Sequence, residues 1–297
     1  MLSYLELMRP VNCLMAVLAV FIGEILVIRW NGSLFLEQAL YFGLIAVFLI
    51  AGAGNAINDY KDFEADKINR PERPIPSGRI KRSSALIFSI LLFVLGTVLA
   101  AFINWMAFGI AVINSLLLIL YTYYFQDKMF VGNFIISYLV GSTFLFGNVV
   151  MGDYRLGFVL MFLAGLSNFS REIIKDLEDI EGDKQSFLKK ITSKVGSIAE
   201  RFRITPKGVK LKYRKRYALF ISEFSLVLAV LFSPLPFLTG ILGYSYMVVV
   251  GFADLIFMWC VWKMFTYKQK QDLAKISKNI KAGMFFGLLA FLAGALL

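Results

Sequence analysis

Two acidic clusters with the same spacing stand out in the chain. Each contains three aspartates separated by three and then four residues, so on a helix each cluster would lie along one face. Carboxylates gathered at one membrane face repel one another, and hard divalent cations such as Mg²⁺ prefer carboxylate oxygen. Because such an Mg²⁺ shares its remaining positions with phosphate groups, the spacing predicts a metal and diphosphate site. The predicted metal ligands, which are also the predicted catalytic carboxylates, are Asp59, Asp62, Asp66, Asp176, Asp179 and Asp183.

Cationic and amide side chains accompany both clusters and are candidates for binding phosphate oxygens. The stretch NRPERPIPSG after the first cluster, residues 69–78, contains three prolines and predicts a rigid, non-helical loop. Its arginines are suited to bidentate phosphate binding. Arginine and tyrosine at the ends of spans are also common as interfacial anchors, and this alternative applies to Arg9 and Tyr121. The predicted substrate-binding residues are Arg9, Asn12, Asn58, Arg70, Arg73, Tyr121, Lys128, Asn168, Arg171 and Lys175.

The elements that must position these residues are membrane spans. The chain has 297 residues, is 59% hydrophobic and only 17% charged, and has a mean hydropathy of +0.71. A soluble domain carries more charge, whereas these apolar runs are long enough to cross a bilayer as helices. We expect an all-α polytopic membrane protein with cytoplasmic helical caps, forming one transmembrane domain over residues 1–297. Nine spans are predicted, at about residues 12–29, 36–56, 84–104, 106–125, 131–151, 156–172, 216–233, 237–262 and 281–297.

Basic residues predict the orientation of the spans. All Lys and Arg except Arg29 and Arg155 fall at the N-terminus or in loops after even-numbered spans. By the positive-inside rule, the N-terminus and both clusters are cytoplasmic and the C-terminus is extracytoplasmic in a cell-membrane protein. The basic region 184–216 is expected to be a mobile amphipathic loop near the headgroups. The two long loops, each with one cluster, cover about residues 57–83 and 173–215.

The composition excludes several classes of function. The net charge of +11 lies in short loops between spans, which indicates anionic lipid and a phosphorylated substrate, not nucleic acid. The chain has no histidine, which removes Ser-His-Asp catalysis, and its two cysteines, Cys13 and Cys260, lie in apolar runs. Ionisable residues inside spans are functional candidates by default. We predict that Glu24 and Glu223 are buried hydrogen-bond partners and that Asp254 is a wall residue of the site.

The two clusters resemble the motifs of the UbiA superfamily of intramembrane prenyltransferases. The resemblance covers the nine spans, the motif N-D-x-x-D-x-x-x-D from Asn58, and the motif D-x-x-D-x-x-x-D from Asp176. A Thr-Leu-Pro-like segment that usually follows the second motif is replaced here by Ile191-Thr192-Ser193. Within the superfamily the chain is most similar to the archaeal digeranylgeranylglyceryl phosphate synthases, in RPVN from Arg9, RPIPSG from Arg73, REIIKDLEDIEGD from Arg171 and KAGMFFGLLAFLAG from Lys281.

This resemblance implies Mg-dependent transfer of a geranylgeranyl group from geranylgeranyl diphosphate to a hydroxyl of geranylgeranylglyceryl phosphate, a step in archaeal ether-lipid biosynthesis. Two Mg²⁺ ions would bridge the aspartates and the diphosphate, and membrane lipid would surround the spans. Two alternatives remain. One is a UbiA-type prenyltransferase with an aromatic acceptor, as in quinone or tetrapyrrole pathways. The other is a divalent cation transporter, whose acidic residues would be expected at mid-membrane and not at one surface.

Overall fold

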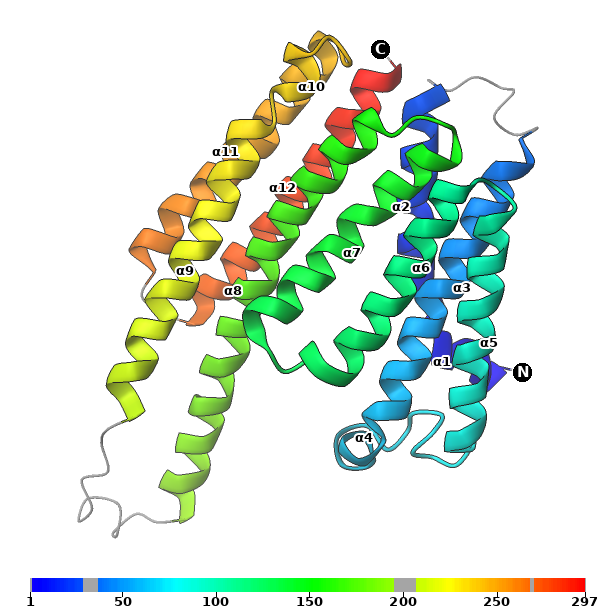
Figure 1. The fold of residues 1–297 in the computed structure, drawn as a ribbon. Coiled ribbons are helices and arrows are strands. Elements are labelled where there is room, and N and C mark those ends of the chain that lie inside the picture. Colours follow the sequence, from blue (N-terminus) through cyan, green and yellow to red (C-terminus); the bar gives the residue numbers. More distant parts are fainter. Residues whose placement is uncertain (1, 29–36, 195–206, 268–269, 297) are drawn as a thin grey trace.

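The computed structural model describes residues 2–28, 37–194, 207–267 and 270–296, with side chains described except at 180–214 and 270. Over these residues the chain forms helices joined by turns (Figure 1). In this described part nine helices are long and apolar enough to cross a membrane, which confirms the predicted all-α, nine-span architecture. The helices are α1 (Leu2–Met8), α2 (Pro10–Ile28), α3 (Gln38–Lys61), α4 (Phe63–Asn69), α5 (Arg82–Ala101), α6 (Trp105–Leu120), the π-helical turn η2 (Tyr121–Phe125), α7 (Met129–Val150), α8 (Arg155–Lys194), α9 (Lys207–Phe232), α10 (Leu235–Leu238), α11 (Tyr244–Thr266) and α12 (Lys270–Leu296).

The spans pack as two neighbouring groups (Figure 1). In one group α3 packs against α2 and α5, and α6 packs against α5 and α7, around one apolar core. In the other group α8, α9, α11 and α12 pack on one another. α2 contacts both groups, because Ile22 and Leu26 share a core with Leu160 of α8 and Phe291 of α12.

Close backbone contacts of α7 join the two groups. A Cβ added at Gly141 would lie 2.4 Å from the carbonyl oxygen of Met161 on α8. A Cβ added at Gly147 would lie 2.2 Å from the carbonyl oxygen of Val20 on α2. Neither position has room for a side chain, so glycine lets α7 pack directly against the backbones of α8 and α2.

The second predicted loop is largely helical. The sequence indicated a loop from residue 173, but α8 continues without a break to Lys194 and α9 begins at Lys207. The helix extends because Ile173, Ile174 and Leu177 form an apolar face that is buried with residues of α9, α11 and α12. The segment 195–206 lies outside the described residues, as do the side chains of residues 191–193.

The last span also begins earlier than predicted. The four lysines of residues 270–281 indicated a loop, and the span was predicted from residue 281. In the structure α12 begins at Lys270. Leu273, Ile276 and Ile280 recur at helical spacing and are buried, so the lysines occupy the other faces of the same helix. This register decides which lysine faces the site described below.

The first long loop is non-helical between Arg70 and Lys81, as its prolines predicted. It is not a free surface loop, because Ile75 and Ile80 are buried in a small core with Leu7 of α1 and Ala85 of α5. Gly78 has a φ of 79°, a conformation that glycine adopts without steric cost. The loop is therefore held against α1 and the start of α5.

The prediction for Glu24 was wrong in its main point. The side chain is fully buried against Gly43 and Val150, but among the described residues neither carboxylate oxygen has a hydrogen-bond partner. Glu223 is buried as well and also lacks a hydrogen bond, although Arg216 Nη1 lies 3.6 Å from its Oε1. A polar group that is buried without a hydrogen-bond partner costs free energy of folding.

Candidate active site

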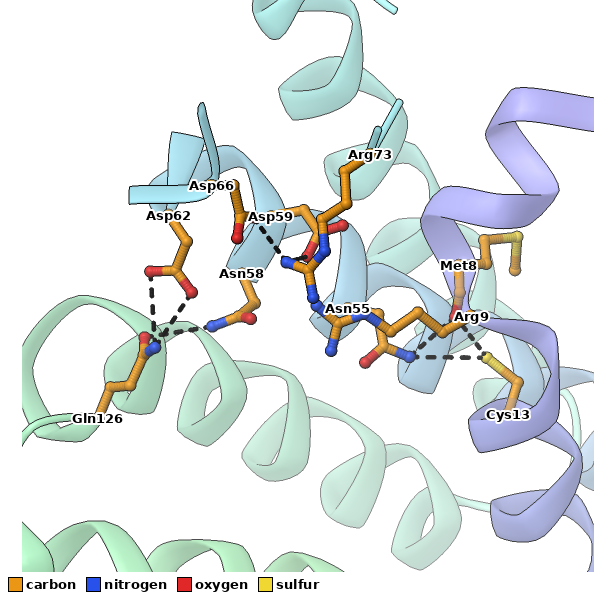
Figure 2. Close-up of polar contacts among 10 residues, drawn as sticks. All are labelled: Met8, Arg9, Cys13, Asn55, Asn58, Asp59, Asp62, Asp66, Arg73 and Gln126. Atoms are coloured by element: carbon orange, nitrogen blue, oxygen red, sulfur yellow. Dashed lines mark hydrogen bonds and ion pairs between the residues drawn. The ribbon is translucent and has the colours of Figure 1, made fainter. Parts of the chain in front are cut away.

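The first motif spans the junction between α3 and α4. α3 ends at Lys61 and α4 begins at Phe63, so Asp62 lies between the two helices. The spacing predicted that the three aspartates share one helical face. Because the helix breaks at Asp62, they do not. Figure 2 shows Asp59 and Asp66 directed towards one group of side chains and Asp62 towards another.

Arginines occupy the Asp59 and Asp66 side of the motif. Arg73 Nη1 lies 3.0 Å from Asp59 Oδ1 and 2.6 Å from Asp66 Oδ2, and Arg9 Nη2 also pairs with Asp59 Oδ1 (Figure 2). Both carboxylates are buried, with side chains at most 9% exposed. Their negative charge is compensated by cations within hydrogen-bonding distance, so these two carboxylates attract a metal ion less than unpaired ones would.

The backbone at Arg9 is strained. Its φ is 53°, and among the described residues no other non-glycine residue has a positive φ. The residue lies between α1 and α2 and precedes Pro10, which further restricts its conformation. Strain of this kind persists where surrounding contacts hold the residue in place, and here the ion pair with Asp59 supplies such a contact.

Asp62 has a neutral partner. Gln126 Nε2 donates a hydrogen bond to Asp62 Oδ2 at 3.1 Å, and Asn58 Nδ2 donates to Gln126 Oε1 at 3.1 Å (Figure 2). The amide orients the carboxylate without neutralising it. Asn55, which shares a helical face with Asn58, instead donates to the carbonyl oxygen of Met8 at 2.8 Å, so it fixes the end of α1.

The second motif has the same type of partner. Asn133 Nδ2 on α7 donates to Asp176 Oδ2 at 2.8 Å, and Asp176 is half-buried. Asp179 is exposed one turn further along α8, and the side chain of Asp183 lies outside the described residues. Arg171 pairs with Glu172 at the start of this stretch.

Tyr121 connects the two motifs. Its side chain lies within electrostatic range of Asp62 on the first motif and of Glu172 and Asp176 on the second. It begins the π-helical turn η2, a local irregularity that often occurs at functional sites. The structure therefore brings charged residues of both motifs near this tyrosine, at the same end of the bundle (Figure 1).

The carboxylates do not yet converge on one point. Among the residues whose side chains are described, no three acidic or cysteine side chains gather closely enough to hold a metal ion. The donor chemistry nevertheless fits Mg²⁺, because within the described side chains the carboxylate oxygens of Asp62 and Asp176 are hydrogen-bonded only to neutral amides. The fit is poorer for Asp59 and Asp66, whose charge is already compensated. The assignment of all six aspartates as ligands remains a prediction.

A cavity of ≈ 500 Å³ lies beside the second motif, between α2, α7, α8, α9, α11 and α12. On α2, α8 and α12, the cavity-lining residues closest to the end of the bundle that carries α4 and the second motif are polar. The lining residues further from that end are largely apolar. The polar end of the lining consists of Asn12, Asn168, Arg171 and Lys281. Asp254 lies in the wall at greater depth, as predicted, and accepts a hydrogen bond of 2.7 Å from Ser233 Oγ.

The cavity reaches the lipid-facing surface between α2 and α12. Met15 and Leu18 on α2 line the cavity and are 62% and 47% exposed. Phe285 on α12 lines it from the other side and is 58% exposed. An apolar chain could therefore pass from the bilayer into the cavity at this side.

Several predicted site residues lie apart from these contacts. Arg70, Lys128 and Lys175 are exposed, and the Lys128 ammonium lies 5.0 Å from the ring centroid of Phe125. Asn168 lines the cavity and donates to Ser137 Oγ at 3.3 Å. Among the described residues neither Arg70 nor Lys175 forms an ion pair or a side-chain hydrogen bond with an aspartate of either motif, although Lys175 interacts electrostatically with the adjacent Asp176.

Sequence reasoning missed three residues of the site. Gln126 and Asn133 hold one carboxylate of each motif, and Lys281 lies at the polar end of the cavity. Gln126 and Asn133 flank Lys128 at the end of a span on the side of the motifs, and this clustering of polar residues was the available signal. Nothing local distinguished Lys281 from its neighbouring lysines, because only the register of α12 separates them.

The loop around the first motif is attached to α1 by another ion pair. Arg79 donates to both carboxylate oxygens of Glu6, at 2.5 and 3.0 Å. These hydrogen bonds hold the pKa of the Glu6 carboxyl below its usual range. The pair is exposed, so it contributes to the position of α1 more than to overall stability.

Comparison with known proteins shows which family the chain resembles. The model of the UbiA prenyltransferase family matches residues 16–289. A digeranylgeranylglyceryl phosphate synthase of Methanosarcina mazei is 41% identical over 98% of both chains, and one of Methanopyrus kandleri is 40% identical over 100% of both. A solved structure reported under the same enzyme name is 36% identical and superposes with a TM-score of 0.83, covering 99% of this chain and 98% of the other. A UbiA homolog from Archaeoglobus fulgidus, described as bound to GPP and Mg²⁺, shares the fold with 18% identity and a TM-score of 0.63, covering 97% of this chain and 99% of that one.

Proposed function

The chain belongs to the UbiA prenyltransferase family and is an intramembrane prenyltransferase, and we propose that it transfers a geranylgeranyl group from geranylgeranyl diphosphate to geranylgeranylglyceryl phosphate. The observation that carries the proposal is the largely apolar cavity with a polar end beside the second acidic motif. Its shape suits a substrate with a long apolar chain and a phosphorylated head. Full-length identity of about 40% to relatives named for this reaction supports the same substrates.

Mg²⁺ is the proposed cofactor. Asp62 and Asp176 would hold it, with Asp179 and Asp183 as further ligands, because amide hydrogen bonds orient the carboxylates of Asp62 and Asp176 and no cation is hydrogen-bonded to either among the described residues. Bound there, the metal would stabilise the negative charge that develops on the leaving diphosphate. The described binding of GPP and Mg²⁺ by a homolog of the same fold is consistent with this role.

The arginines of the first motif would bind diphosphate oxygens directly. The side chains of Arg9 and Arg73 are 31% and 15% exposed, while the Asp59 carboxylate with which both pair is buried. Asp59 and Asp66 thus hold the two arginines in place, and the remaining N–H groups are free to donate to a phosphate. This would position the allylic carbon at the polar end of the cavity.

The cavity walls would then exclude water from the reacting carbon. The bond between the allylic carbon and the diphosphate oxygen breaks, and the electron pair leaves with the diphosphate. Aromatic faces such as those of Phe144 and Phe257, both lining the cavity, can stabilise the resulting positive charge. The acceptor hydroxyl forms the new carbon–oxygen bond, and its proton passes to the released diphosphate. No strong base is needed, because the hydroxyl becomes acidic as it bonds to carbon.

The active site is proposed to face the cytoplasm. The protein is a multi-pass membrane protein, and its C-terminus lies at the opposite end of the bundle from α4 (Figure 1). Basic residues concentrate at the end that carries α4 and the second motif. The positive-inside rule places this end in the cytoplasm.

The test is a product analysis with purified protein, geranylgeranyl diphosphate and Mg²⁺. Parallel reactions contain geranylgeranylglyceryl phosphate or 4-hydroxybenzoate, and products are identified by mass. We expect a doubly prenylated glyceryl phosphate and no prenylated aromatic acid. Prenylation of the aromatic acid alone would remove the proposed acceptor and leave only the family assignment.

A further inference from the structure

The cations near the site divide into paired and unpaired groups. Arg9 and Arg73 pair with carboxylates of the first motif, and Arg171 pairs with Glu172. Lys281 also lines the cavity, but no carboxylate lies within ion-pair distance of its ammonium among the described residues. It is therefore an exposed cation beside an apolar cavity, with no partner anion in the part of the chain whose side chains are described.

The helical register explains why Lys281 faces the cavity. Met284, Phe285 and Leu288 follow at spacings of three and four residues and line the same cavity. Lys281 begins this stripe at the end nearest the second motif. Lys275 and Lys278 on the same helix are exposed but are not among the lining residues.

The neighbours of Lys281 suit a phosphate monoester attached to a lipid. Asn12 on α2 lines the same end of the cavity and carries an amide that can donate hydrogen bonds. The exposed apolar edges of α2 and α12 lie directly beyond, where the cavity meets the bilayer. A lipid phosphate bound at Lys281 could therefore keep its head at the membrane surface while its chain lies between these helices.

We propose that Lys281, assisted by Asn12, binds the phosphate group of the acceptor lipid, separately from the diphosphate of the donor. This inference rests on the proposed function, because it assigns the second anionic group that such an acceptor carries. Two phosphorylated substrates repel each other unless each has its own cation. In a glyceryl phosphate the secondary hydroxyl is separated from the phosphate ester oxygen by only two carbons. A phosphate at the polar end of the cavity would thus hold this hydroxyl near the donor carbon.

The experiment compares Lys281→Ala and Lys281→Met with the matched controls Lys275→Ala and Lys278→Ala. Initial rates are measured against the concentration of each substrate with the other saturating. We expect the KM for geranylgeranylglyceryl phosphate to rise about 10- to 100-fold in both Lys281 variants, because a charge-assisted contact is lost. The KM for the diphosphate should stay within about twofold, and the controls should match the wild type. Lys281→Arg should retain most of the affinity.

The acceptor alcohol without its phosphate provides a second readout. Wild type should use geranylgeranylglycerol poorly, and Lys281→Ala should use it no worse, because the contact being tested is already absent. Equal KM values in Lys281→Ala and Lys278→Ala would overturn the proposal. A raised KM for the diphosphate alone would assign Lys281 to the donor and overturn it as well.

Direct binding separates this proposal from the proposed function. Binding of labelled geranylgeranylglyceryl phosphate is measured in detergent without donor, so no turnover is required. If wild type binds it more tightly than Lys281→Ala but never prenylates it, the proposed reaction fails and the phosphate site stands. If both bind it equally, the phosphate site fails whatever the enzyme catalyses.

Discussion

The first acidic motif lies at a break between two helices and its outer carboxylates are paired with arginines, whereas the second lies on an unbroken helix and Asp176 meets a neutral amide. The same spacing of aspartates therefore has two different environments. Asp62 is the exception in the first motif, because its partner is also an amide. We propose that partner type, and not position in the motif, separates the carboxylates that bind a metal from those that position arginines.

The largest effect should follow removal of divalent cations. With excess EDTA we expect turnover to fall to background and to return when Mg²⁺ is added, because the metal would balance the charge that develops on the leaving diphosphate and Arg9 and Arg73 alone would not. The measurement is product formation from geranylgeranyl diphosphate and the acceptor. Undiminished turnover in EDTA would mean that neither motif holds a catalytic metal.

Substitution within the motifs should distinguish the two kinds of carboxylate. We expect Asp62→Asn and Asp176→Asn each to lower turnover by about 100-fold or more, because each removes metal-borne stabilisation of the leaving group. Asp59→Asn should cost only about tenfold, because Arg73 keeps its contact with Asp66. Rates are compared at saturating substrates. If turnover falls by the same factor in all three variants, the proposed difference between metal-binding and arginine-positioning carboxylates is wrong.

The amides should act on metal affinity more than on folding. We expect Gln126→Leu and Asn133→Leu each to raise the Mg²⁺ concentration that gives half of the maximal thermal stabilisation by about tenfold, as is typical for residues that hydrogen-bond to metal ligands. The readout is thermal stabilisation by Mg²⁺ with inorganic pyrophosphate, which needs no turnover.

The control for these amide variants is Gln38→Leu, an exposed amide at the start of α3. Its Mg²⁺ requirement should equal that of the wild type. If all three variants behave alike, the hydrogen bonds to Asp62 and Asp176 do not prepare a metal site.

The smallest effect concerns the ion pair between Glu6 and Arg79. Because the folded pKa of Glu6 is lowered, its contribution to stability is present above the ordinary value of 4.5 and is lost as the pH falls through the lower folded value. Glu6→Gln should therefore lower the Tm by less than about 2 °C at pH 7 and by less still at pH 3. The measurement is thermal unfolding at the two pH values. A larger loss at pH 3 than at pH 7 would contradict this sign.

The sequence by itself determined the spans and the identity of the chemistry. Long apolar runs can satisfy their backbone in a bilayer only as helices, so nine spans followed directly from composition. The spacing of the aspartates and the nearby arginines also indicated a phosphate and metal site, because carboxylates are preferred ligands of Mg²⁺ and arginine is a preferred ligand of phosphate. The prolines of residues 69–78 likewise predicted the absence of helix there.

Only the tertiary structure decided which partners these residues meet. Asp59 on α3 pairs with Arg9, and a repeat pattern cannot reveal a contact between residues fifty positions apart. The start of α12 could not be predicted from the sequence, because the lysines of residues 270–281 resemble those of a loop. The structure shows that the other face of this segment is apolar and buried against neighbouring helices. Lys281 lies nearly one turn further along that helix than Lys278, and the packing of α12 beside α8 and α2 decides which of them lines the cavity.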